Sequence, residues 1–140
     1  MTRVLATGTF DILHPGHLFY LSQASALGDE LYVIVARASM IKHKPTPVLP
    51  DAHRLEMVRA LRVVDHAVLG SERDIFEPLY EIRPDIIALG FDQCFDLHDL
   101  KAELVNRGFD AEVVRIEKTN TDKLCSTRRI IDLILEMNKS

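Results

Sequence analysis

Short apolar runs alternate with segments of helical period along the whole chain. The apolar runs are rich in β-branched residues, and they predict strands at residues 3–7, 30–36, 67–69, 85–89 and 111–116. Between them, apolar residues recur every three or four positions, which predicts helices at residues 16–27, from 51 onwards, 75–82, 97–106 and 126–137. Strands that alternate with helices are typical of βαβ units and a parallel sheet. The pattern therefore predicts an α/β fold.

Glycines, prolines and capping residues are placed to separate these elements. Asp51 is expected to cap the helix that follows it, and Gly28 and Gly108 to end the helices before them. Residues 39–50 contain three prolines, which predicts a loop. With 140 residues and no linker-like or repeated segment, the chain suits one domain, residues 1–140. We expect a Rossmann-like three-layer sandwich: a five-stranded parallel sheet with helices on both faces.

Composition and charge narrow the classes of function. The net charge of −4 and the lack of a basic stripe argue against a nucleic-acid partner. No apolar run approaches the roughly 18 residues of a membrane span. The first residues lack a secretory pattern, so a cytoplasmic location is expected. Cys94 and Cys125 show no zinc-binding spacing and are expected to be reduced and unpaired.

The strongest chemical signal is the segment GTFDILHPGH, residues 8–17, between the first strand and the first helix. In an open parallel sheet, ligands bind beyond the carboxyl ends of the strands, and a helix N-terminus offers free N–H groups to phosphate. His14 and His17 lie three residues apart, so both imidazoles can face one bound group. Two nearby histidines could also be incidental or half of a metal site. Their position beside Gly8 and Gly16 favours handling of phosphate.

This segment resembles the HxGH signature of the cytidylyltransferase-like nucleotidyltransferases. The resemblance implies that His14 and His17 stabilise a pentacoordinate α-phosphate while the acceptor displaces pyrophosphate directly. It also implies magnesium or another divalent ion, carried in with the nucleoside triphosphate, and the metal ligands stay unknown. The residues that it places around the nucleotide in this loop are Thr9, Phe10, His14, Pro15, Gly16 and His17.

Further segments extend the resemblance over the whole chain. Lys42 and Lys44 resemble the paired lysines that neutralise phosphates in the cytidylyltransferase branch, with a solvated loop as the alternative. Arg62 and Asp65 resemble an arginine and an aspartate assigned to the acceptor phosphate, with ordinary surface charge as the alternative.

Two later segments resemble the nucleotide-binding parts of the family. Asp92 would accept hydrogen bonds from ribose hydroxyls, with a turn-forming aspartate as the alternative. Ser126, Thr127 and Arg128 resemble the element that opens the last helix and grips the β- and γ-phosphates, with a simple helix cap as the alternative. Asn120, in the loop before that helix, is also assigned to the nucleotide. The expected catalytic residues are His14, His17, Lys44 and Arg128.

Within the superfamily, the chain resembles the archaeal FAD synthases in LATGTFDILHPGH, VIVAR and RPDIIALGFDQ, and in Cys125 before the Ser-Thr-Arg element. Some of those enzymes have a second cysteine where this chain has Asp122. The implied reaction is the transfer of AMP from ATP to FMN with release of pyrophosphate, and the family also suggests a homodimer.

Other functions stay open at this point. A glycerol-3-phosphate cytidylyltransferase, or another small phosphate-acceptor enzyme using CTP or ATP, is the main alternative. Gln93, the absence of tryptophan and Thr121 in place of a family arginine argue against the former. A non-catalytic nucleotide-binding module is less favoured, because both histidines are intact.

Overall fold

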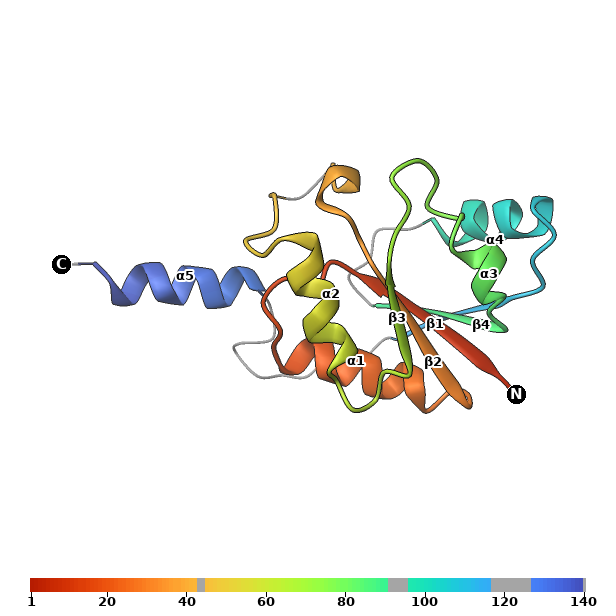
Figure 1. The fold of residues 1–140 in the computed structure, drawn as a ribbon, viewed down its shortest axis with the longest axis horizontal. Coiled ribbons are helices and arrows are strands. Elements are labelled where there is room, and N and C mark those ends of the chain that lie inside the picture. Colours follow the sequence, from red (N-terminus) through yellow and green to blue (C-terminus); the bar gives the residue numbers. More distant parts are fainter. Residues whose placement is uncertain (43–44, 91–95, 117–126, 140) are drawn as a thin grey trace.

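The protein is described from a computed structural model, which defines residues 1–42, 45–90, 96–116 and 127–139. Within these ranges, five parallel strands form one sheet in the order β3-β2-β1-β4-β5 (Figure 1). The strands are β1 (Arg3–Gly8), β2 (Glu30–Val35), β3 (His66–Leu69), β4 (Ile86–Leu89) and β5 (Glu112–Arg115). The helices are α1 (Pro15–Ser25), η1 (Ala38–Met40), α2 (Asp51–Arg59), α3 (Leu79–Ile82), α4 (Leu97–Asn106) and α5 (Thr127–Met137). The predicted α/β fold with a five-stranded parallel sheet is confirmed.

Strand β1 is the centre of the sheet. It pairs with β2 on one side, from Arg3 opposite Glu30 to Gly8 opposite Val35. On the other side it pairs with β4, from Val4 opposite Ile86 to Ala6 opposite Ala88. The chain first builds outward from β1 through β2 to β3 and then returns to β4. The strand order therefore reverses between β1 and β4, where open α/β sheets form their ligand crevice.

Each face of the sheet is covered by its own pair of helices. Val4 and Ala6 of β1 share one apolar cluster with Leu21 of α1 and Val58 of α2. Leu5, which lies between them in sequence, belongs to a second cluster with residues of α3 and α4. Successive strand residues point to opposite faces, so a strand buried on both sides reads as a continuous apolar run. This is why the sequence pattern identifies the central strands so clearly.

Two local expectations were wrong. The helix predicted over 75–82 contains only Leu79–Ile82, because a turn centred on Pro78 precedes it. Pro50, not Asp51, is the residue before α2, and the Asp51 carboxylate bonds elsewhere.

Helix α5 stands apart from the sandwich and points away from it (Figure 1). None of the residues of α5 is buried, although its sequence is strongly amphipathic. The final helix is therefore present as predicted, but within the described residues its apolar side has no core to cover.

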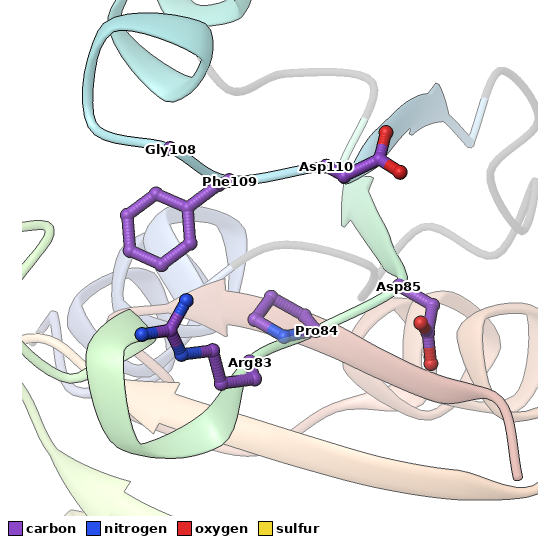
Figure 2. A pocket seen from close by; sticks show the side chains of 6 residues that line it. All are labelled: Arg83, Pro84, Asp85, Gly108, Phe109 and Asp110. Carbon is purple, nitrogen blue, oxygen red and sulfur yellow. The ribbon is translucent and has the colours of Figure 1, made fainter.

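A small cavity lies at the amino ends of β4 and β5 (Figure 2). Its volume is about 220 Å³, and it is lined by Arg83, Pro84, Asp85, Gly108, Phe109 and Asp110. The Arg83 guanidinium lies 5.8 Å from the centre of the Phe109 ring. Because ligands of parallel sheets bind at the opposite edge, this cavity is separate from the site built around the histidines. Among the described residues, no helix is both long and apolar enough to cross a membrane.

The close approach of Gly28 to the first strand gives a test of the packing. A Cβ at this position would lie 2.7 Å from Val4 Cγ2 and 2.9 Å from the Thr2 carbonyl oxygen. Gly28→Ala should therefore lower the free energy of unfolding by about 1–3 kcal/mol, measured by urea denaturation. Gly70→Ala is the control, because its Cβ would meet Ile34 at an ordinary 3.4 Å. Equal stabilities of the two variants would contradict this account.

Candidate active site

The loop between β1 and α1 has a constrained backbone. Phe10 has a φ of 51°, a left-handed conformation that is unfavourable for a residue with a side chain. Its ring is buried and lies 5.4 Å from the ring of His17, centre to centre. A Cβ on Gly8 would lie 2.9 Å from the Phe10 ring. Gly8 is thus required to give room to Phe10, and strained residues of this kind cluster at functional sites.

His14 and His17 cap the first turn of α1. The Nδ1 atom of His14 accepts a hydrogen bond from the Gly16 amide at 3.0 Å, and Nδ1 of His17 accepts one from the His14 amide at 3.3 Å. The two rings stack with their centres 3.8 Å apart. This is a capping box made of imidazoles. A neutral imidazole that accepts at Nδ1 carries its proton on Nε2, so the cap fixes which ring nitrogen can donate.

The charge state of His17 follows from its surroundings. Burial and the neighbouring His14 lower the pKa of His17 from 6.5 to about 3, and the carboxylate of Asp11 opposes this shift. At neutral pH His17 is therefore an uncharged hydrogen-bond donor. His17 itself therefore contributes no positive charge toward binding a triphosphate.

The carboxylate of Asp11 joins the histidine loop to the loop before α2. Its two oxygens accept hydrogen bonds from the amides of Val48, at 2.7 Å, and Leu49, at 2.9 Å. Asp11 is largely buried. Both oxygens have backbone donors, so its role in this structure is to hold the two loops together.

The guanidinium of Arg54 is fully buried, with 0% of the residue exposed. It donates hydrogen bonds to three backbone carbonyls: Thr9 at 2.9 Å, Ala36 at 2.6 Å and Leu49 at 3.0 Å. It also pairs with the carboxylate of Asp51. These carbonyls belong to the loop after β1, the end of β2 and the loop before α2. One side chain thus fixes three segments at the carboxyl edge of the sheet.

Sequence reasoning did not assign this role to Arg54. A signal was available, because Arg54 lies four residues before the buried Val58 and so on the same side of α2. An arginine on the buried side of a helix indicates a site where backbone carbonyls need donors.

Tyr20 marks the point where β1 and β4 diverge. Its hydroxyl accepts a hydrogen bond from the Thr7 amide at 3.1 Å and donates one to the Ala88 carbonyl at 2.5 Å. The paired register of the two strands ends at Ala6 and Ala88. The hydroxyl bridges the strands immediately beyond their last pair, at the base of the expected crevice.

The structure brings some of the other predicted residues to the same edge. The Thr127 hydroxyl donates to the Ile12 carbonyl at 3.2 Å, which ties the start of α5 to the histidine loop. Arg128 follows it, is highly exposed, and lies 3.9 Å from Asp132. Lys42 is exposed and follows η1, beyond the carboxyl end of β2. Lys44, Asp92, Asn120 and Ser126, together with Cys94 and Cys125, lie outside the described residues.

Arg62 and Asp65 lie at the opposite end of the sheet from the histidine loop. They lie in the connection from α2 to β3, which enters β3 at its amino end. The Asp65 carboxylate accepts a hydrogen bond from the Leu31 amide at 2.7 Å, at the start of β2. The geometry therefore assigns Asp65 to the α2–β3 connection and does not support an acceptor-phosphate role for this pair.

Metal-binding side chains do not converge in the described residues, where no group of three histidine, cysteine or acidic side chains is suitably arranged. The ligands of a divalent ion are not assigned by the geometry.

The comparisons with known proteins agree with this fold and loop geometry. Residues 5–133 match the sequence profile of the cytidylyltransferase-like family, so the chain belongs to that family. Within it, the chain is 61% identical to an FAD synthase of Methanohalophilus mahii over 140 residues, covering 100% of this chain and 99% of the relative. An FAD synthase of Methanosarcina mazei is 62% identical over 136 residues, covering 97% and 90%.

A solved structure supports the same grouping. A protein of Thermoplasma volcanium described as a lipopolysaccharide core biosynthesis protein is 45% identical and superposes with a TM-score of 0.82. The match covers 86% of this chain and 99% of that chain. The resemblance to the archaeal FAD synthases is therefore confirmed across almost the whole length.

The depressed pKa of His17 predicts how stability depends on pH. The unfolded state takes up a proton near pH 6.5, whereas the folded state does so only near pH 3. The contribution of uncharged His17 to the free energy of unfolding is therefore complete above pH 6.5. It decreases as the pH falls from 6.5 towards 3, by up to about 1.4 kcal/mol per pH unit. His17→Gln keeps a capping acceptor but does not titrate, so its unfolding free energy should fall less between pH 7 and pH 4. Identical slopes in urea denaturation would contradict the prediction.

Replacing the buried guanidinium tests its structural role. Arg54→Lys keeps the charge but removes the planar fork that reaches three carbonyls, so the free energy of unfolding should fall by about 3 kcal/mol or more. Arg59→Lys is the matched control, on the exposed side of the same helix with one bond to the Ala67 carbonyl. This control should change stability by less than about 1 kcal/mol. A loss in Arg54→Lys as small as that of the control would refute the role.

Proposed function

We propose that this protein is an FAD synthase, a nucleotidyltransferase that transfers AMP from ATP to FMN and releases pyrophosphate. The observation that carries the proposal is identity above 60% to FAD synthases along nearly the entire chain. The imidazole-capped helix N-terminus at the carboxyl end of β1 supports it, because this arrangement suits a phosphate whose charge increases during reaction.

The reaction we propose is a direct in-line displacement. A terminal phosphate oxygen of FMN attacks the α-phosphorus of ATP, and the bond from that phosphorus to the bridging oxygen of the leaving pyrophosphate breaks. The FMN phosphate is ionised at neutral pH, so the attacking oxygen needs no strong general base. Catalysis then depends on positioning and on stabilisation of the charge that develops on the α-phosphate oxygens.

His14 and His17 are proposed to donate their Nε2 hydrogens to those oxygens. Both Nδ1 atoms are already engaged with backbone amides, so the rings are oriented before the nucleotide binds. Preorganised donors cost no reorganisation at the moment of reaction, which is why they favour the transition state over the ground state. The amides of the first turn of α1 and the backbone from Thr9 to Gly16 would complete the contact with the α-phosphate.

The other proposed contacts to the substrates come from residues around the α-phosphate. Lys42 and Lys44 would neutralise the triphosphate and the acceptor phosphate, and Arg128 with Ser126 and Thr127 would bind the β- and γ-phosphates. Asp92 and Asn120 would contact the nucleoside. The divalent ion, with magnesium proposed, enters with the triphosphate as part of the substrate. We further propose one domain over residues 1–140, a cytoplasmic location and a homodimer.

The assignment of substrates is tested by pyrophosphate release. Purified protein with magnesium is supplied with FMN or glycerol 3-phosphate as acceptor, each paired with ATP or CTP. Release with FMN alone, and faster with ATP than with CTP, is expected. Release with glycerol 3-phosphate and CTP but not with FMN would overturn the acceptor and identify a glycerol-3-phosphate cytidylyltransferase.

The role of the histidines is tested by a substitution that preserves the helix cap. Asparagine is a good N-cap residue, so His14→Asn should keep the first turn of α1 while removing the Nε2 donor. Turnover should fall by about 10²–10³-fold, with little change in the free energy of unfolding. His17→Gln should behave in the same way. Normal turnover in either well-folded variant would rule out the proposed mechanism.

A further inference from the structure

Arg37 is a partly exposed cation at the carboxyl edge of the sheet, and the reaction proposed above gives it no role. It lies two residues after the end of β2 and directly before η1. Its side chain is 30% exposed. Arg54, at the same edge, differs in that its guanidinium is fully buried and bonded to backbone carbonyls. A ligand bound at this edge can therefore reach Arg37 but not Arg54.

The backbone on both sides of Arg37 is fixed relative to the histidine loop. The Ala36 amide donates a hydrogen bond to the Gly8 carbonyl at 2.9 Å. The Ala36 carbonyl accepts one from Arg54 at 2.6 Å. On the other side, the Ala38 amide donates to the carboxylate that pairs with Arg54, at 2.9 Å. Arg37 thus extends from a segment whose position is set by the same contacts that set the histidine loop.

The side chain of Arg37 is firmly held at its inner end and loosely held at its outer end. Its Nε donates to the Gly70 carbonyl, just beyond β3, at 2.6 Å. Its Nη1 lies 3.6 Å from the carboxylate of Glu72, whose side chain is 72% exposed. An exposed ion pair of this kind contributes little to stability. An arriving anion with a higher charge can therefore replace Glu72 without moving the guanidinium.

The chemistry and the position of this group indicate its ligand. The planar guanidinium binds phosphate oxygens through two parallel N–H donors, which an ammonium group cannot do. In an in-line displacement, the acceptor and the leaving pyrophosphate lie on opposite sides of the α-phosphorus. Helix α5, which carries Arg128, is bonded to the histidine loop at Ile12. The segment of Arg37 is bonded to the other end of that loop, at Gly8.

We propose that Arg37 binds the phosphate monoester of the acceptor, on the side of the histidine loop opposite to the pyrophosphate. Glu72 occupies the guanidinium in the free protein, and the acceptor phosphate displaces it. Arg37 thus has the role that the geometry does not support for Arg62 and Asp65. The identity of the acceptor as FMN rests on the proposed function, whereas the contact with a phosphate monoester requires only that the acceptor carries one.

The contact is tested by the kinetics of pyrophosphate release. Arg37→Gln should raise the KM for FMN by about 10–100-fold, because a hydrogen-bonded charge pair is lost. The KM for ATP should stay within about twofold of the parent value. Arg73→Gln is the matched control, since it removes the same charge from an exposed position next to Glu72, and it should leave both constants unchanged. An unchanged KM for FMN in Arg37→Gln, or an equal rise in the KM for ATP, would overturn the proposal.

A comparison of FMN with riboflavin isolates the phosphate. Riboflavin has the same ring system and side chain but no phosphate, so Arg37→Gln should weaken binding of FMN and leave binding of riboflavin unchanged in isothermal titration calorimetry. An equal loss of affinity for both compounds would indicate a damaged pocket and would refute the phosphate contact.

Glu72→Gln separates contact with the substrate from a structural ion pair. This variant keeps Arg37 but removes its carboxylate partner, so the KM for FMN should stay the same or fall. A rise equal to that in Arg37→Gln would show that the ion pair itself is what matters, and would overturn the proposal.

The second acceptor distinguishes failure of this inference from failure of the proposed function. If the parent protein uses glycerol 3-phosphate and not FMN, the FAD synthase assignment is refuted. Arg37→Gln should then raise the KM for glycerol 3-phosphate, which would leave the phosphate contact standing. An unchanged KM for whichever acceptor the parent protein uses would refute the contact alone.

Discussion

The buried guanidinium of Arg54 is the constraint on which the carboxyl edge of the sheet depends. Loops at this edge leave backbone carbonyls away from water, and a buried carbonyl without a donor is costly. Arg54 supplies donors to Thr9, Ala36 and Leu49 at once. Asp51 balances its charge and also accepts from the Ala38 amide. The histidine loop therefore has its position set by a residue of α2 that is not itself expected to contact a substrate.

The rings of His14 and His17 have two roles: they cap helix α1, and they are the proposed donors to phosphate. Each ring accepts a hydrogen bond from a backbone amide at the start of α1 through Nδ1, which fixes the orientation of the ring. Burial keeps His17 uncharged, so the ring contributes direction rather than net charge. Asp11 holds the same loop in place, because its carboxylate accepts hydrogen bonds from two amides of the loop before α2. Recognition of phosphate would then combine the uncharged donor of His17 with positive charge from lysine and arginine side chains.

Two kinds of feature could be predicted from the sequence: elements with a regular spacing of apolar residues, and the single motif of residues 8–17. Buried strands such as β1 read as apolar runs, and GTFDILHPGH combines turn, helix start and donors in ten residues. The position of Arg62 and Asp65 could not be predicted, because it depends on which edge of the sheet the α2–β3 connection enters, and sequence spacing does not show this. Arg54 was missed because its partners are carbonyls, which every residue has. Only the three-dimensional structure shows which of them lack another donor.

The central position of β1 has a consequence for how the protein is made. This strand is synthesised before the other four strands of the sheet, but its neighbour β4 begins only at Ile86. During synthesis β1 can therefore pair with β2 alone until β4 has been made. Such long-range parallel pairing slows folding and exposes strand edges in the meantime. Strand β1 is thus a segment that needs protection from aggregation in the nascent chain.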